Sequence, residues 1–248
     1  MRLFRRTWGT GDTVAALIHG GGTDSRTWHR VGPALADRGF RVIAVDLRGH
    51  GQSPRGYYSP RALADDLVEN LPEQVDLAVG HCLGAAVLAL ALPLLRPRHA
   101  VYAEPYWSVM GSPRPLSPNA FAEFTETDPA LLAARHPRWT PADIDAEIAA
   151  RACWDVRVSL DLHRFDMPPA PDPAPEGSLV LLADADEPLI PIDPRALRER
   201  GFRVRTVSDA GHAIHHDNLP GFLTALQLSF SCLAYRPADR RASTVRSP

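Results

Sequence analysis

The sequence lacks lysine altogether, and each of its 27 basic residues is an arginine. This absence excludes mechanisms that need a lysine Schiff base or the lysine of a phosphate-binding loop. Cysteine is scarce too: there are three, none in a C-x-x-C pair, so the sequence provides neither a disulfide framework nor a zinc knuckle. We therefore expect a protein of the reduced cytoplasm. The exclusive use of arginine, with 24 prolines, is typical of GC-rich coding.

Long hydrophobic segments are also missing, since no stretch approaches the roughly 20 apolar residues that span a bilayer. Residues 1–6 are basic like the start of a signal peptide, but the apolar run at 14–18 is too short for an export signal. A net charge of −2 argues against nucleic acid or an anionic membrane as a partner. We expect a soluble, cytoplasmic chain that binds neither.

What is present is an ordinary globular composition, with 248 residues of which 45% are hydrophobic, enough for one domain with a full core. Short apolar runs predict buried strands at residues 13–18, 41–47, 76–80, 100–103, 179–183 and 202–207. Stretches with helical spacing lie between or after them, at residues 25–38, 59–71, 83–95, 193–200 and 219–233. Alternating strands and crossover helices predict an α/β fold with a mostly parallel, doubly wound sheet.

The alternation breaks after the fourth predicted strand. Residues 108–177 contain no strand-like run but two helical stretches, at about 118–135 and 140–153, and a proline-rich exit. We therefore expect a core formed by residues 1–107 and 178–235, with residues 108–177 inserted over the sheet as a helical lid. The polar tail, residues 236–248, is expected to be disordered.

The main chemical motif is Gly80-His81-Cys82-Leu83-Gly84, between an apolar strand and an apolar helix. A nucleophile on such a turn is held strained and exposed at the carboxyl edge of the sheet, and the flanking glycines let strand and helix approach closely. The backbone N–H of Leu83 lies at the helix N-terminus, where it can face a developing oxyanion. This placement makes Cys82 the candidate nucleophile.

Four motifs in order resemble the α/β-hydrolase family. The sequence His19-Gly20-Gly21-Gly22 is similar to the family's oxyanion loop, and the resemblance implies a second oxyanion N–H from Gly21. The segment 46–51 resembles the family's D-x-R-G-x-G turn, where we expect Asp46 and Arg48 to brace the loop. The Cys82 motif falls where the nucleophile elbow belongs, and Gly211-His212 falls where the catalytic histidine belongs.

Cysteine at the elbow departs from the family's usual serine. One reading is a small buried thiol in a protein that has lost catalysis. The other, which we favour because both glycines and the histidine motif are intact, is a thiolate nucleophile paired with His212. A thioester acyl-enzyme would follow, and this raises thioester, lactone or acyl-transfer chemistry beside ester hydrolysis.

The third member of the triad is less clear. The strand at 179–183 is followed by Asp184-Ala185-Asp186-Glu187-Pro188. Aligning the family's acid from the strand side points to Asp186, which we favour, whereas aligning back from Pro191 points to Glu187. Asp184 fits a structural cap. Either acid would hold the tautomer of His212.

We expect substrate contacts from residues near the loop, the elbow and the end of the fourth strand, namely Gly22, Trp28, His81, Tyr106 and Trp107. Core packing is the competing role for Trp28, and a structural role competes for His81. Glu104 either lines the acyl pocket or forms part of a hinge. No metal-ligand spacing is present, and no cofactor is implied.

The sequence thus predicts a cofactor-free hydrolase or acyl-transfer enzyme with a Cys82–His212–Asp186 triad, acting on a small-molecule ester, lactone or thioester. Its composition would suit bacterial secondary metabolism. Two alternatives remain open: a lyase that uses His212 as base, and a catalytically silent ligand-binding member of the same fold.

Overall fold

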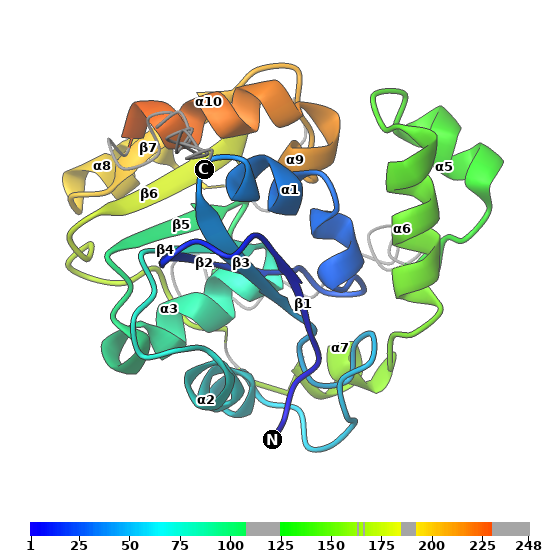
Figure 1. Cartoon of the computed structure of the whole chain (residues 1–248), viewed down its shortest axis with the longest axis horizontal. Helices are drawn as coiled ribbons and strands as arrows, with labels where there is room; N and C mark the ends of the chain where they lie inside the picture. The colour runs from blue at the N-terminus through cyan, green and yellow to red at the C-terminus, as the bar shows by residue number, and fades with distance from the viewer. Residues whose placement is uncertain (108–124, 163, 166, 185–191, 230–248) are drawn as a thin grey trace, which may run out of the picture.

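The computed structural model describes residues 1–107, 125–162, 164–165, 167–184 and 192–229. Its centre is a seven-stranded sheet in the order β1-β3-β2-β4-β5-β6-β7, in which only β1 is antiparallel to its neighbour (Figure 1). The strands are β1 (Arg5–Trp8), β2 (Thr13–Ile18), β3 (Phe40–Val45), β4 (Leu77–His81), β5 (His99–Ala103), β6 (Ser178–Ala183) and β7 (Arg203–Val207). The predicted mostly parallel α/β fold is confirmed.

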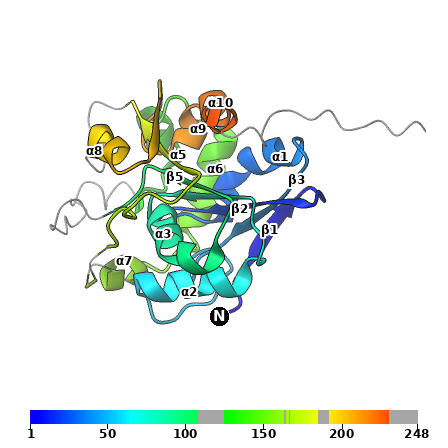
Figure 2. The ribbon, with the colours of Figure 1, turned by 90° about the vertical axis from the view of Figure 1, so that its left-hand side faces the viewer.

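Helices cover both faces of the sheet, and each face has its own hydrophobic core (Figure 2). On one face lie α2 (Pro60–Asn70), α3 (Leu83–Leu95) and α8 (Pro194–Glu199). The other face holds the 3-10 helix η1 (Ser25–Trp28), α1 (Val31–Ala36), α9 (Ile214–Asp217) and α10 (Leu219–Ser229). Strands buried on both faces explain the nearly continuous apolar runs in the sequence.

Two local differences from the predicted elements have physical reasons. Strand β1 was not predicted, because four residues of alternating exposure at a sheet edge leave no apolar run. The helix expected over 25–38 is divided into η1 and α1. A continuous helix would place Pro33 in its interior, where its ring clashes with an earlier carbonyl, whereas the restart at Val31 puts it in a first turn. By contrast, the helix start at Ser59-Pro60 is confirmed, with the Ser59 hydroxyl accepting from Ala62 N–H.

Between β5 and β6 the described residues form three helices, namely α5 (Pro129–Arg135), α6 (Pro141–Arg151) and α7 (Arg157–Leu162). Helices α5 and α6 stand beside η1 and α9 at one end of the sheet (Figure 1). We call this pair the α5–α6 insert. The first part of the predicted lid, residues 108–124, and the predicted tail, residues 236–248, lie outside the described residues. The domain boundaries and the lid role stay predictions.

Strand register brings the chemical motifs to one edge. Ile18 of β2 pairs with Gly80 of β4, and His81 of β4 pairs with Ala103 of β5. Because these strands are parallel, the residues that follow them leave the sheet at the same carboxyl edge. The glycine loop after β2, Cys82 after β4 and Glu104 after β5 are therefore neighbours.

Candidate active site

Cys82 occupies the sharp turn between β4 and α3, with a left-handed φ of 49° that is costly for a residue with a side chain. Its N–H donates to the Ala103 carbonyl at 3.0 Å, and its own carbonyl accepts from Ala85 and Tyr106. These backbone bonds hold the strained conformation and place the largely buried thiol at the end of the sheet. The geometry matches the turn expected from the sequence.

The two glycines of the motif are required by close backbone approach. A Cβ on Gly80 would lie 2.6 Å from the Cα of Ala85, and one on Gly84 would lie 2.4 Å from the carbonyl oxygens of Ile18 and His19. Real Cβ atoms do not come this close to backbone atoms. The predicted reason for these glycines is therefore confirmed.

His212 lies in the turn between β7 and α9 and faces the elbow. Its ring lies 4.8 Å from the ring of His81, and the Nε2–H of His81 donates to the His212 carbonyl at 2.8 Å. Burial lowers the pKa of His81 well below its usual range, so this ring is neutral and serves as a donor. The structure thus ties the histidine turn directly to the residue before Cys82.

The carboxylate that reaches His212 comes from Glu104, the residue after β5. Glu104 is buried, with a φ of 45°. Its Oε1 accepts from the Ala183 N–H at 2.7 Å, which leaves Oε2 3.4 Å from Nδ1 of His212. This separation is longer than an ideal hydrogen bond, and catalytic contacts are often long in unliganded enzymes.

Two neighbours set the charge on His212. Burial lowers the pKa of this ring, but the Cys82 side chain and then Glu104 outweigh burial and raise the pKa of His212 to about 10. The ring therefore holds its proton at neutral pH between a sulfur and a carboxylate. Such an imidazolium can balance a negative charge on Cys82.

The glycine loop after β2 is held by two buried histidines. His19 donates through Nδ1 to the Gly20 carbonyl and accepts through Nε2 from Leu47 N–H at 2.9 Å. The N–H of Gly22 points to Nε2 of His50 at 3.4 Å, and the oxyanion role of Gly21 stays a prediction. Leu83, the other expected donor, is the first residue of α3, where backbone N–H groups have no acceptor within the helix.

Asp46 braces this region, as predicted. One carboxylate oxygen accepts from Ser25 N–H at 2.8 Å and the other from Gln52 N–H at 2.9 Å. Arg48, also predicted to brace, donates to both oxygens of the buried Asp66. These contacts tie the loop after β3 to η1 and to α2.

Three of the expected substrate contacts, Tyr106, Trp28 and Trp107, fall into two groups. Tyr106 lies beside the thiol: burial raises the pKa of its phenol, and the charge of Cys82 raises it further. Trp28 is fully buried and stacks on His215 at 4.4 Å, and Trp107 packs against Tyr102 and Phe202. Both indoles occupy hydrophobic core positions. This placement favours a packing role for them, and contact with substrate stays a prediction.

Asp186 and Glu187, the two acids weighed in the sequence, lie outside the described residues, and Asp184 is exposed at the end of β6. Sequence reasoning missed Glu104 as a partner of His212. A usable signal existed: Glu104 is an acid directly after the strand that neighbours the nucleophile strand. The resemblance to the family placed the acid after β6, the strand next to β5 in the sheet.

Among the described residues, no group of three or more histidine, cysteine, aspartate or glutamate side chains is arranged to hold a metal ion. The same part of the chain has no helix with the length and apolar character to cross a membrane.

Comparison with known proteins places this geometry in a family. The sequence model of the "Alpha/beta hydrolase family" matches residues 16–223. A pimeloyl-(acyl-carrier protein) methyl ester esterase from Aeromonas hydrophila is 32% identical over 199 residues, which are 75% of this chain and 74% of that protein. An uncharacterized protein of Mycobacterium tuberculosis is 47% identical over 87 residues, 33% of this chain but only a quarter of that protein's length.

Solved structures agree with the sequence relatives. An N-formylmaleamic acid deformylase from Pseudomonas putida S16 superposes with a TM-score of 0.72 at 25% identity, covering 90% of this chain and 94% of that one. A thioesterase domain from the curacin biosynthetic pathway shares the fold, with a TM-score of 0.64 at 21% identity over 92% and 94% of the two chains. With the family model spanning most of the sequence and the elbow, loop and histidine turn meeting at one sheet edge, this chain belongs to the alpha/beta hydrolase family.

Proposed function

We propose that this protein is a hydrolase or acyl-transfer enzyme that acts on carboxylic esters or thioesters, with Cys82 as the nucleophile. The observation behind this proposal is the strained Cys82 turn facing a half-buried His212 whose Nδ1 points to Glu104. A nucleophile, a base and an orienting carboxylate at one sheet edge are the parts that acyl transfer needs. A lactone, which is a cyclic ester, is a third substrate class that the same chemistry can open.

The relative with the broad match supports an ester as substrate. Its name describes cleavage of a methyl ester on a carrier-bound acyl chain. We infer for this chain the shared chemistry only, an acyl group on an oxygen or sulfur leaving group.

The reaction begins from the ion pair in which His212 already holds the proton and Cys82 is a thiolate, and the thiolate attacks the carbonyl carbon. The carbonyl oxygen takes up the negative charge and is held by the N–H groups of Gly21 and Leu83. When the tetrahedral intermediate collapses, the bond to the leaving group breaks and His212 gives its proton to that group. The product is a thioester on Cys82.

The acyl group is released from Cys82 by a second acyl transfer, in which an acceptor molecule takes the place of the thiolate as the attacking group. His212 removes a proton from water, or from an acceptor alcohol or thiol, and the resulting oxygen or sulfur attacks the thioester carbonyl. Collapse breaks the bond to Cys82 and releases its thiolate beside the protonated His212, which restores the starting ion pair. Glu104 accepts the Nδ1–H of His212 throughout, and thereby fixes the tautomer and stabilises the imidazolium. Glu104 takes the role that the sequence gave to Asp186.

The test is intact-protein mass spectrometry after rapid mixing with aryl esters, methyl esters and acyl thioesters. A transient acyl mass on the wild type, mapped to the peptide of Cys82, is expected. The variant Cys82→Ala should lose the adduct and turn over substrate at least about 10⁴-fold more slowly while keeping its fold by circular dichroism. The same adduct argues against the lyase and against the silent binding protein.

Cys153→Ser is the matched control, because Cys153 is the other free cysteine in the described part of the chain and lies away from the elbow, beside Arg26. It should keep both adduct and turnover. Undiminished turnover in Cys82→Ala would refute the nucleophile. If no substrate gives an adduct and Cys82 is also inert to iodoacetamide, covalent catalysis is wrong.

A further inference from the structure

The α5–α6 insert is attached to the core by a buried ionic cluster, and this cluster lies outside the catalytic groups described above. Its centre is His216 on α9, which is 1% exposed. Nδ1 of His216 lies 2.9 Å from Oδ1 of Asp143, and Nε2 lies 3.3 Å from Oε1 of Glu147. Both acids belong to α6, one turn apart, and both are buried. A single imidazole therefore faces two carboxylates from another element.

Arginines complete the cluster at its rim. Arg30 lies between η1 and α1, and its guanidinium donates to Oδ2 of Asp143 at 2.9 Å and to the His216 carbonyl at 3.2 Å. Arg151 on α6 contacts Glu147 at 3.3 Å. Each arginine contacts one carboxylate, whereas the His216 ring lies between both. A proton on this ring lets one side chain of α9 pair with two buried carboxylates of α6 at once.

A second set of contacts joins the insert to the turn that contains His212. Ala213, the next residue, packs against Leu132, Trp139 and Ile144 of the insert. The indole N–H of Trp139 donates to Oδ1 of Asp217 at 3.1 Å, and Oδ2 of Asp217 accepts from Gly211 N–H at 2.9 Å. The residues on both sides of His212 are therefore linked to the insert, Ala213 directly and Gly211 through Asp217.

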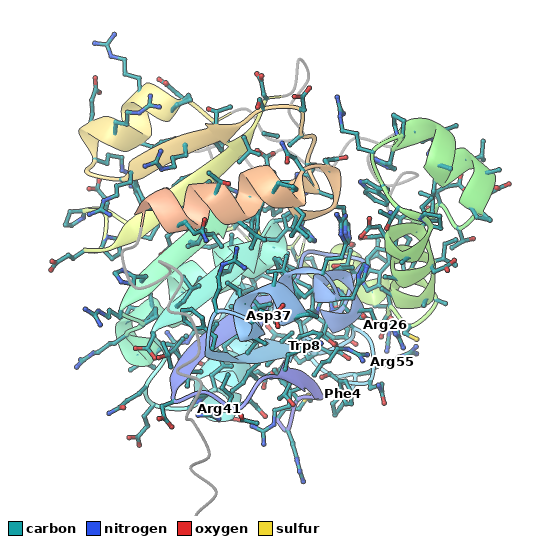
Figure 3. All side chains as sticks on the ribbon, turned by 45° about the horizontal axis from the view of Figure 1, so that its top comes forward. Phe4, Trp8, Arg26, Asp37, Arg41 and Arg55 are labelled. Atoms are coloured by element: carbon teal, nitrogen blue, oxygen red, sulfur yellow. The ribbon has the colours of Figure 1, made fainter. Side chains whose placement is uncertain are left out.

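The opposite edge of α6 is held by Arg26 of η1, which points toward the insert (Figure 3). Its guanidinium donates to the Ala149 carbonyl at 2.9 Å and pairs with Asp24 at 2.6 Å. Arginine keeps its charge at every pH the protein meets. The His216 bridge, unlike the Arg26 contact, is one that titration can break.

We propose that His216 is a positioning residue that, as an imidazolium between Asp143 and Glu147, fixes the α5–α6 insert against the turn of His212, and that loss of its proton releases this attachment. The consequence for catalysis rests on the proposed function of His212. The attachment itself does not, and it can be measured without any substrate.

The groups that face His216 come from four parts of the fold. They are Asp143 and Glu147 on α6, Arg30 and His29 beside η1, His215 on α9 and, further off, His81 at the elbow. Burial lowers the pKa of His216, but the two carboxylates outweigh it and raise the pKa to about 9. Burial lowers the pKa values of His29, His215 and His81, so these rings are neutral at pH 7.

The direction of the pH effect follows from this difference. A group whose folded pKa is raised stabilises the folded arrangement fully below its unfolded value, near 6.5, and loses that effect as the pH rises through the folded value. The attachment should therefore be intact at pH 6.5 and lost as the pH passes about 9.

Hydrogen–deuterium exchange of the unliganded protein between pH 6 and 10 tests this, with rates corrected for intrinsic exchange. In the wild type, peptides covering 141–151 and 211–217 should lose protection with a midpoint near pH 9, whereas α2 and α3 should not. In His216→Gln these two peptides should exchange roughly tenfold faster at pH 7. His29 is a neutral ring 3.4 Å from Asp143, so the control variant His29→Gln should leave the protection of both peptides unchanged.

Glu147→Gln covers the case in which His216→Gln does not fold. It keeps the shape of the side chain but removes one of the carboxylates that hold the proton, so the midpoint of the exchange profile should fall below that of the wild type. An unshifted midpoint in Glu147→Gln, or protection in His216→Gln equal to that of the wild type, would overturn the proposal. So would equal loss of protection in His29→Gln.

Discussion

The turns after β4 and β5 form an instructive pair. The strands are neighbours in register, with His81 opposite Ala103, and each is followed by a non-glycine residue in the left-handed region, Cys82 at 49° and Glu104 at 45°. Both side chains are directed to His212. The first turn is flanked by two glycines that form a recognisable sequence motif. The second turn, Ala103-Glu104-Pro105, contains no such motif.

Hydrogen bonds hold both turns, and the difference between them lies in how closely neighbouring backbone segments approach. After β4 the chain enters α3 at once and passes within van der Waals contact of β2, so only glycine fits at position 84. After β5 the strained residue is held by hydrogen bonds: Glu104 N–H donates to the Leu181 carbonyl at 2.9 Å, and its carboxylate accepts from Ala183. Steric constraint selects a residue type and so leaves a motif. Backbone hydrogen bonding accepts most residue types and leaves none.

Removing the charge at the second turn gives the largest effect that we expect from this comparison. In Glu104→Gln, the amide oxygen can still accept from Ala183, so the amide NH₂ turns toward Nδ1 of His212 and favours the wrong tautomer. We expect kcat to fall about 10²–10⁴-fold. Because Glu104 raises the pKa of His212, the alkaline limb of the pH–rate profile should move to lower pH. Steady-state kinetics on an aryl ester from pH 6 to 10 measure both effects.

Asp186→Asn is the matched variant for that experiment, since the sequence assigned the same role to Asp186. If Glu104 orients His212, Asp186→Asn should keep kcat within about threefold of the wild type. A large loss in Asp186→Asn together with a small one in Glu104→Gln would reverse the assignment.

A substitution at the close-packed turn after β4 should change the stability of the fold rather than the protonation of His212. In Gly84→Ala the new methyl group would lie 2.4 Å from the carbonyl oxygens of Ile18 and His19, so β2 and α3 must separate. We expect the free energy of unfolding to fall by about 2–3 kcal/mol, the upper part of the range for overpacked sites. Urea denaturation followed by circular dichroism measures this loss.

Gly21→Ala provides the contrast within the same site. A Cβ there would meet only a Leu83 side-chain carbon at 3.8 Å, and Gly21 has no left-handed φ. Its stability should equal or slightly exceed that of the wild type, because alanine restricts the unfolded chain. Equal destabilisation of both variants would show that close approach is not what selects glycine at position 84.

The same distinction explains what the sequence could predict. Buried strands and the elbow are steric features, visible as apolar runs and as Gly80 and Gly84. The role of Glu104 depends on which strands are neighbours and on a hydrogen bond to Ala183, 79 residues away. The cluster of His216, Asp143 and Glu147 joins segments more than 60 residues apart and has no local pattern at all. Strand β1 was missed for a related reason, because its pairing with β3, not its composition, makes it a strand.

His81 links the turn after β4 to the turn of His212 and gives the smallest of these effects. Its Nε2–H donates to the His212 carbonyl, and the ring stays neutral over the working pH range because burial lowers its pKa well below the usual value. His81→Leu removes one neutral hydrogen bond, worth about 1 kcal/mol, which would appear as roughly a fivefold lower kcat/KM. His81→Gln places an amide N–H at a similar reach and should recover most of that loss. If Gln and Leu behave alike, the hydrogen bond does not position the histidine turn, and packing of the ring against His212 would be its whole contribution.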